Sequence, residues 1–127
     1  MIQLTDRCNA TCPQCGMNIN ERFPRQSLPL DDVKRMIDAA AERGVAAISF
    51  TGGEPLLALK DLVALINHAG AAGIGYIRTG TNGFSFRSPE KPDFHDRMHR
   101  LAETLAATPL RNFWISIDSA DPATHEQ

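Results

Sequence analysis

The chain has 127 residues, 43% of them apolar and 22% charged, which is typical of one globular domain and excludes a disordered chain. Thirteen Lys and Arg against fifteen Asp and Glu give a net charge of −2, so no basic excess indicates nucleic acid as the main partner. No apolar run approaches the ~20 residues that span a bilayer, and charged residues near the N-terminus argue against a secretory signal. We therefore expect a cytoplasmic protein without a membrane segment.

The first half of the chain predicts a strand, a loop, a helix and a second strand. Residues 1–5 alternate like a short strand, and residues 6–27 are rich in Cys, Asn and Pro, as loops are. Residues 28–43 have apolar positions at helical spacing, with two Asp in the first turn and Gly44 where a C-terminal cap belongs. Residues 45–50 (VAAISF) are a continuous apolar run, typical of a strand that is buried on both faces of a parallel sheet.

The second half continues this alternation of helices and strands. Residues 59–69 and 93–107 have apolar positions on one helical face, and residues 74–79 and 112–118 are short segments typical of strands. The complete order is strand, helix, strand, helix, strand, helix, strand. This order predicts an α/β fold with a parallel sheet built from right-handed βα crossovers.

The last residues carry a separate signal. Asp121 followed by Pro122 is typical of a helix start, yet the chain stops five residues after Pro122. The chain is also too short for a complete eight-stranded α/β barrel of ~250 residues. We therefore expect residues 1–127 to be one domain that is truncated at its C-terminus, with a frayed terminal turn as the alternative.

The three cysteines, Cys8, Cys12 and Cys15, all lie in the loop after the first strand, at the spacing C-x3-C-x2-C. Three thiolates in one short loop can face a single metal centre, whereas an odd number of clustered cysteines is a poor disulfide framework. Structural zinc sites and electron-transfer clusters normally take four protein ligands, so three leave one position open for chemistry. A zinc site completed by a distant histidine stays open as an alternative, the candidates being His68, His95, His99 and His125.

Four motifs together resemble a known family. LTDRCNATCPQC, which contains the cysteines, is followed by TGGEP at 51–55, GTNG at 80–83 and SID at 116–118, each at the end of a predicted strand. In this order and spacing the motifs resemble the radical S-adenosylmethionine (SAM) superfamily. The resemblance covers essentially the whole chain. It implies that residues 1–127 form the first four βα units of a partial (β/α)6 barrel of the TIM type.

By this resemblance, Cys8, Cys12 and Cys15 bind three irons of a [4Fe–4S] cluster, and SAM chelates the fourth iron. A one-electron reductant such as a flavodoxin or ferredoxin supplies the electron that breaks the S–C5′ bond, and the 5′-deoxyadenosyl radical abstracts a hydrogen atom from substrate. The resemblance thus implies an oxidoreductase-like enzyme with an unidentified substrate. The motifs look closest to peptide-modifying maturases and cofactor-biosynthesis enzymes. A non-catalytic iron–sulfur or zinc binding module is the rival interpretation.

The TGGEP motif is expected to hold part of SAM. Gly52 and Gly53 lack side chains, so backbone can approach a ligand closely, and in the family this loop meets the methionyl amino group. Glu54 is the acidic residue of the loop, and a carboxylate beside an ammonium is electrostatically favourable. Pro55 fixes the turn. Taken alone, the motif would indicate only a tight turn between a strand and a helix.

Polar residues at other strand ends are further candidates for contacts with SAM. Asn82 and Ser116 resemble positions at which the family contacts the ribose or carboxylate, and Asp118 ends the same strand as Ser116, facing SAM or substrate. Polar groups at strand ends inside a barrel need partners, and a ligand supplies them. Gln14 stands where the family often has an aromatic residue near adenine, so only its backbone is expected to contact that ring. We expect Trp114 to be a core residue.

Overall fold

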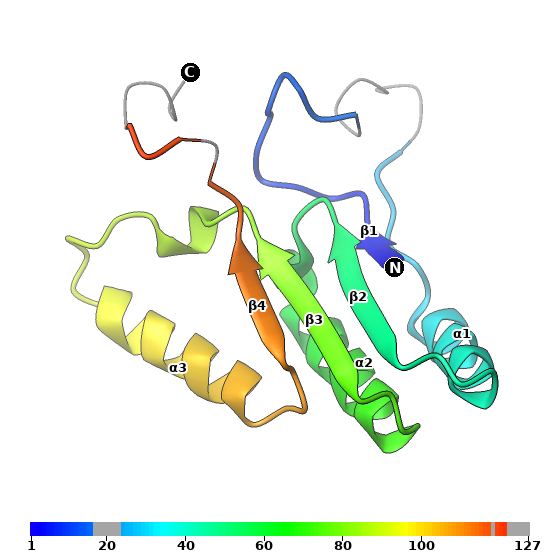
Figure 1. Ribbon diagram of the computed structural model, residues 1–127. Helices are drawn as coiled ribbons and strands as arrows, with labels where there is room; N and C mark the ends of the chain where they lie inside the picture. The colour runs from blue at the N-terminus through cyan, green and yellow to red at the C-terminus, as the bar shows by residue number, and fades with distance from the viewer. Residues whose placement is uncertain (17–23, 118, 122–127) are drawn as a thin grey trace.

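The computed structural model describes residues 1–16, 24–117 and 119–121. Four parallel strands alternate with helices in one sheet (Figure 1), which confirms the predicted α/β fold. The strands lie in the sheet in their order along the chain, β1-β2-β3-β4. The elements are β1 (Ile2–Thr5), α1 (Leu30–Glu42), β2 (Ala47–Gly52), η1 (Pro55–Ala58), α2 (Leu59–Ala71), β3 (Tyr76–Thr81), η2 (Phe84–Phe86), α3 (Phe94–Ala106) and β4 (Asn112–Ile115).

The helices α1 and α2 pack on the same face of the sheet. Right-handed crossovers between neighbouring parallel strands in sequential order place the connecting helices on one side. A doubly wound fold instead changes direction within its strand order and carries helices on both faces. Sequential order with the helices on one face is therefore the arrangement of a partial TIM-type barrel wall, as the sequence predicts.

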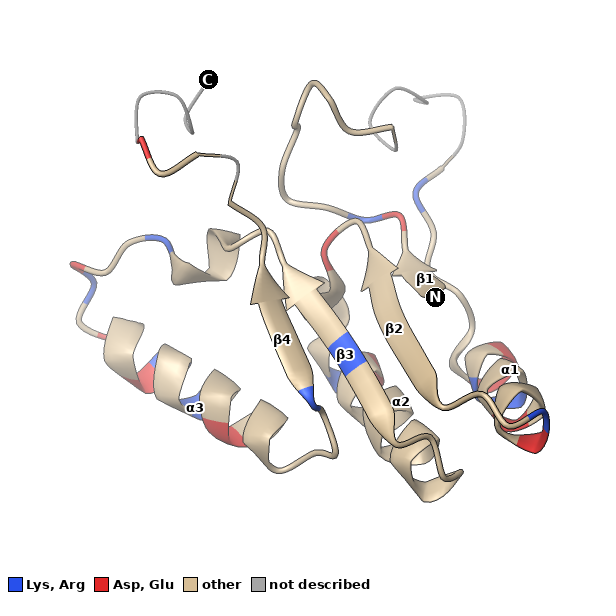
Figure 2. Ribbon diagram, viewed as in Figure 1, with Lys and Arg blue, Asp and Glu red and all other residues tan. Residues whose placement is uncertain are grey.

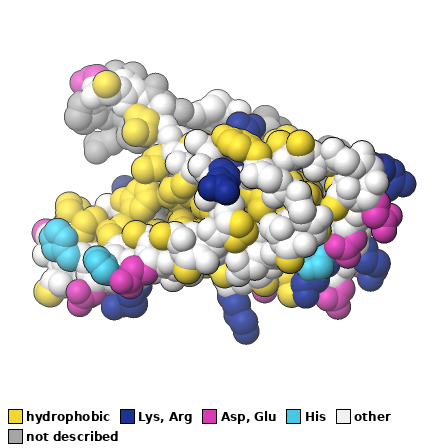
Figure 3. Space-filling model, turned by 60° about the horizontal axis from the view of Figure 1, so that its bottom comes forward, with side chains coloured by type: hydrophobic (Ala, Val, Ile, Leu, Met, Phe, Trp, Pro, Cys, Tyr) yellow, Lys and Arg dark blue, Asp and Glu magenta, His cyan; other side chains and the backbone are white. Residues whose placement is uncertain are grey.

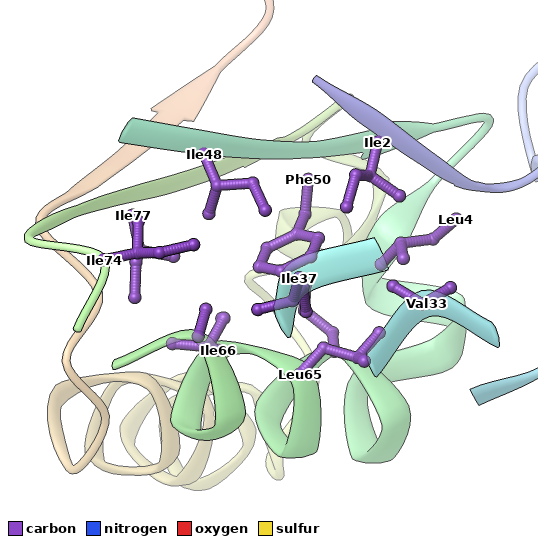
Figure 4. Close-up of a cluster of buried hydrophobic side chains, with 12 residues drawn as sticks. Ile2, Leu4, Val33, Ile37, Ile48, Phe50, Leu65, Ile66, Ile74 and Ile77 are labelled. Carbon is purple, nitrogen blue, oxygen red and sulfur yellow. The ribbon is translucent and has the colours of Figure 1, made fainter. Parts of the chain in front are cut away.

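Apolar side chains buried between the sheet and the helices form the core (Figure 4). Phe50 of β2 lies at the centre of this cluster and is fully buried, as is Ile37 of α1. Side chains alternate along a strand, so Ile48 and Phe50 face the helices while Ser49 faces the other way. The other members of the cluster are Ile2, Leu4, Val33, Leu62, Leu65, Ile66, Ala69, Ile74 and Ile77. This core holds β1, β2 and β3, whose ends carry three of the four predicted motifs.

The strands β2 and β3 both begin two residues later than the sequence pattern predicts, and the reason is the way the preceding helices end. At the end of α1, Gly44 has a φ of 73°, and the Val45 N–H donates to the Ala40 carbonyl at 3.0 Å. This is the Schellman arrangement of a helix C-terminus. The helix α2 ends in the same way at Gly73 and Ile74. The apolar residues at both predicted strand starts are therefore parts of helix caps.

Charged side chains lie mainly on the helices and loops, and the strands are almost bare of them (Figure 2). Arg78 in β3 is the one charged residue of the four described strands, and it is paired in register with Ser49 on the face opposite the core. Hydrophobic side chains also reach the surface (Figure 3), and Ile115 of β4 is 46% exposed. Within the described ranges, no helix is both long enough and apolar enough to cross a membrane.

Candidate functional site

Three loops that are distant in sequence meet at the carboxyl ends of the strands (Figure 1). The loop after β1 carries the cysteines, the loop after β2 carries Gly53 and Glu54, and the loop after β3 carries Asn82. Parallel strands present their carboxyl ends at one edge of the sheet, which is where such folds build their sites. The sheet therefore brings together most of the residues that the sequence analysis selected.

Gly52, the last residue of β2, and Gly53, which follows it, let the chain pack backbone to backbone against the end of β1 and the start of the cysteine loop. The Gly53 N–H donates to the Thr5 carbonyl at 2.7 Å, and the Glu54 N–H donates to the Arg7 carbonyl at 2.8 Å. A Cβ on Gly53 would stand 2.2 Å from the Arg7 carbonyl oxygen. One on Gly52, whose φ is 152°, would stand 2.5 Å from the Thr5 carbonyl oxygen. The absence of side chains at these two glycines therefore has a second consequence besides close approach to a ligand. It lets the start of the cysteine loop pack directly against the backbone at the end of β2.

Glu54 is a buried carboxylate whose two oxygens accept hydrogen bonds from backbone amides. Its side chain is 1% exposed. Oε1 accepts from the Leu56 N–H at 3.0 Å and so caps η1, while Oε2 accepts from the Asn82 N–H at 2.8 Å. A buried charge needs such donors, because the water that would solvate it has been removed. In this chain Glu54 thus links the loop after β2 to the loop after β3 by hydrogen bonds.

Asn82 in turn fastens the loop after β3 to the cysteine loop. Its Nδ2 donates to Asn9 Oδ1 at 2.9 Å and to Cys8 Sγ at 3.5 Å. Its Oδ1 accepts from the Phe84 N–H at 3.0 Å. With the bonds of Glu54, these contacts join all three loops by directional polar interactions.

The three cysteines line one small pocket, and none of them forms a disulfide. The Cys15 N–H donates to the Cys12 carbonyl at 3.1 Å, which folds the end of the motif into a turn. Cys8 Sγ also accepts from the Ala10 N–H at 3.4 Å. The remaining lining residues are Asp6, Ala10, Arg25 and Gly53. The predicted grouping of the cysteines at one site is thus present in the fold.

The histidines that a zinc site would need do not line this pocket within the described part of the chain. His68 Nε2 lies 2.6 Å from Asp38 Oδ1, where it joins α2 to α1. His95 and His99 are exposed on α3. His125 lies outside the described residues. Among the described residues, no histidine is therefore placed as a fourth ligand beside the cysteines.

A second pocket, of about 110 Å³, adjoins the first, and Gly53 lines both. The predicted residues Gly52, Gly53, Pro55, Asn82 and Ser116 line it together with Thr51, Gly80, Thr81 and Trp114. Glu54 and Gln14 line neither pocket; Glu54 is buried, and Gln14 is exposed on the cysteine loop. Asp118 lies outside the described residues. The second pocket thus gathers residues from the ends of β2, β3 and β4.

Residues 2–127 match the sequence profile of the Radical SAM superfamily. The chain belongs to the radical SAM superfamily. Among curated relatives, PqqA peptide cyclase from Xanthomonas campestris pv. campestris is 32% identical over 123 residues, and GTP 3′,8-cyclase from Synechococcus sp. is 37% identical over 125 residues. Each alignment covers 97% of this chain but 29% and 32%, respectively, of the relative. The chain therefore spans about a third of the length of the curated relatives it matches.

The cysteine loop has the donor chemistry of a radical SAM iron–sulfur site. Within the described residues, no three side chains of His, Cys, Asp or Glu are placed to hold a single metal ion. A [4Fe–4S] cluster makes a different demand, because each cysteine binds a different iron and the sulfurs surround the cluster instead of meeting at one point. Three thiols around one pocket, with N–H donors directed at Cys8 Sγ, fit that demand.

Trp114 lines the second pocket, so the prediction that it is a core residue is wrong. It is paired in register with Gly80, and a Cβ on Gly80 would stand 2.2 Å from the indole ring. The Arg78 guanidinium carbon lies 5.4 Å from the centroid of the same ring. Because side chains alternate along a strand, Trp114 shares a face with Ser116 and not with the core. That alternation was the signal in the sequence that identifies Trp114 as a pocket residue.

Proposed function

We propose that Cys8, Cys12 and Cys15 hold a [4Fe–4S] cluster and that the adjoining pocket binds SAM. In this proposal SAM is cleaved reductively, and a hydrogen atom is abstracted from the substrate. The observation that carries the proposal is that the two pockets share Gly53. A group held by the thiols and a ligand in the second pocket would be neighbours across a residue without a side chain. Membership of the radical SAM superfamily supports the same assignment.

The chain's own residues supply binding and orientation in this proposal. When bound, the cluster supplies one electron that breaks the S–C5′ bond of SAM and releases a 5′-deoxyadenosyl radical. The backbone at Gly52 and Gly53 allows close approach of the methionyl part, Ser116 offers a polar group from a further strand end, and Asn82 lines the same pocket with its amide hydrogens directed at the cysteine loop. The side chains named only by resemblance, Gln14 and Asp118, stay candidates on sequence grounds alone.

For the substrate we propose a peptide under modification or a precursor in cofactor biosynthesis. The relatives named PqqA peptide cyclase and GTP 3′,8-cyclase support these two classes. A one-electron donor, flavodoxin or ferredoxin, completes the reaction as partner. Thiols that serve as metal ligands require a reducing compartment, for which we propose the cytoplasm.

We also propose that residues 1–127 form the first four βα units of a (β/α)6 radical SAM core domain. The face of the sheet opposite the helices carries Arg78 and Ser49. The Ser49 Oγ is buried, and among the described residues it has no hydrogen-bond partner. Polar side chains that face the inside of a barrel find partners in ligands, water or further strands, so a closed wall would satisfy them.

Anaerobic reconstitution of the intact protein with iron and sulfide tests the proposed function. We expect about four irons per chain, as in a [4Fe–4S] cluster. We also expect an electron paramagnetic resonance (EPR) spectrum that changes when SAM is added, and 5′-deoxyadenosine after reduction with dithionite. Stoichiometric zinc without a response to SAM would overturn the proposal in favour of a zinc-binding module. A cluster whose EPR spectrum does not change when SAM is added would favour a non-catalytic iron–sulfur module.

The ligand assignment is tested separately with the variant Cys12→Ala. Loss of one thiolate should abolish the [4Fe–4S] signal, because each cysteine holds a different iron. The control is Thr11→Ala, which changes an exposed neighbour in the same loop that carries no sulfur and should keep a normal iron content. A normal cluster in Cys12→Ala would refute this residue as a ligand.

A further inference from the structure

We infer that Asn82 sets the reduction potential of the cluster by donating a hydrogen bond to the sulfur of Cys8, and that buried Glu54 positions Asn82 for this contact. The inference rests on the proposed function, because it requires Cys8 to be a cluster ligand. It gives Asn82 a role toward the cluster, and it gives Glu54 a role as a positioning residue that acts through Asn82.

The orientation of the Asn82 amide is determined by its own contacts. A backbone N–H binds only an acceptor, so the Phe84 N–H at 3.0 Å identifies the atom facing it as Oδ1. The amide nitrogen then faces the cysteine loop, where it lies 2.9 Å from Asn9 Oδ1 and 3.5 Å from Cys8 Sγ. The two amide hydrogens thus have one acceptor each.

Glu54 holds the backbone from which this side chain projects. Its Oε2 accepts from the Asn82 N–H at 2.8 Å, while its Oε1 is engaged by the Leu56 N–H at 3.0 Å. The Glu54 side chain is almost completely buried, so its two oxygens are largely shielded from bulk water. A carboxylate held at both oxygens is a rigid support, and the position of Asn82 relative to Cys8 depends on it.

An N–H donor at a ligand sulfur changes the electronic balance of an iron–sulfur cluster. Reduction adds negative charge, part of which resides on the cysteine sulfurs, and a hydrogen bond to sulfur stabilises that charge. The contact from Asn82 therefore favours the reduced cluster. Its removal should make the potential more negative, without removing any iron ligand.

The principal test is Asn82→Leu, which keeps the approximate volume of the side chain but has no amide hydrogen. After anaerobic reconstitution of the intact protein, a redox titration followed by EPR measures the midpoint potential without SAM. We expect the equilibrium for reduction to become about three- to tenfold less favourable, a shift of about 30–60 mV to more negative potential at 59 mV per tenfold change for one electron. The matched control is Asn67→Leu, an exposed asparagine of α2, which should leave the potential unchanged.

A second variant keeps the test decisive if leucine disturbs the loop. Asn82→Asp retains the oxygen that accepts from the Phe84 N–H, but it replaces the donor at Cys8 with a charged oxygen. The potential should shift further to the negative side than in Asn82→Leu, because a negative charge is added beside the sulfur. A purely structural role of Asn82 would not produce this order.

The role of Glu54 is tested with Glu54→Gln and with the double variant. Gln keeps one acceptor oxygen and places an NH2 group against one of the two N–H groups, so Leu56 and Asn82 can no longer both be held by this side chain. Glu54→Gln also removes a buried negative charge, which by itself shifts the potential to the positive side, whereas the loss of support for Asn82 shifts it to the negative side. We therefore expect Glu54→Gln to shift the potential further to the positive side in the Asn82→Leu background, where no positioned amide is left to lose, than in the unaltered protein. Additive shifts would overturn the positioning role.

The remaining outcomes separate the inference from the proposed function. Full iron content with an unchanged potential in both Asn82 variants would overturn the inference and leave the proposed function intact. Loss of the cluster from both variants would also overturn it, because Asn82 would then serve assembly of the loops and not the potential. Failure of the unaltered protein to bind a cluster would instead overturn the proposed function.

Discussion

On the helix-covered face of the sheet, Phe50 and Ile37 are fully buried among other apolar side chains. At the carboxyl edge of the sheet, the loops are instead joined by hydrogen bonds between backbone atoms and by those of a few polar side chains. Burial of apolar surface is non-directional, so that face holds the strands together without fixing any one atom. At the edge, the bonds of Glu54 and Asn82 have defined donors and acceptors. The comparison indicates that overall stability and the placement of Cys8 depend on different parts of the molecule.

Phe50→Ala should have the largest effect on stability. It leaves a cavity at the centre of the core, and such truncations cost about 3–5 kcal/mol of the free energy of unfolding. Chemical denaturation measures this loss, with Leu57→Ala as the control because that side chain is 53% exposed. At a temperature where the variant is folded, its iron content after reconstitution should be normal. A loss of iron from the folded variant would show that the core and the cysteine loop are not separate.

Gly53→Ala should destabilise the protein less but damage the site more. The added Cβ cannot fit 2.2 Å from the Arg7 carbonyl oxygen, so the cysteine loop must move. We expect a loss of about 2–4 kcal/mol, from about 1–3 for overpacking and about 1 for a disturbed hydrogen bond. Iron content after reconstitution should fall as well.

The control for Gly53→Ala is Gly75→Ala, since a Cβ at Gly75 would meet no atom within 4 Å. That variant should be close to neutral in both measurements. If Gly53→Ala kept full iron content while losing stability, the glycines would not seat the cysteine loop in the way their contacts indicate.

His68→Ala should have the smallest effect. The contact between His68 and Asp38 joins α1 to α2 at the surface, and partly exposed pairs of this kind contribute at most about 1 kcal/mol. A double-mutant cycle with Asp38→Asn isolates the coupling free energy. A coupling well above 1 kcal/mol would mean that the outer helices depend on directional contacts too, and the contrast between the two regions would weaken.

The order of the elements was predictable from the sequence, but their ends were less so. Apolar runs and helical spacing identify the strands and helices because both patterns arise within one segment. The start of β2 was misplaced because Val45 is apolar like a strand residue, although its N–H caps α1 behind Gly44. A glycine followed by an apolar residue can be either the end of a helix cap or the start of a strand. Which of the two it is depends on the hydrogen bond that the N–H of the apolar residue forms.

In the candidate site, too, some features could be predicted from the sequence and others could not. The cysteine spacing and the TGGEP motif identified the loops, and Asn82 and Ser116 were found beside them. What the sequence analysis missed was the position of Trp114 over Gly80 and the engagement of both oxygens of Glu54. Both features depend on the register between strands and on which loops become neighbours. The sequence of a single segment determines neither the register nor the neighbours.

The sequence by itself determined the βα alternation, the clustering of the three cysteines in one loop and the superfamily, because each follows from local spacing or from motif order. Only the tertiary structure decided that Gly53 stands against the Arg7 carbonyl, that Glu54 supports Asn82, and that Asn82 reaches the sulfur of Cys8. These contacts join residues up to 74 positions apart. They exist because parallel strands, aligned by a shared core, bring their carboxyl ends to one edge.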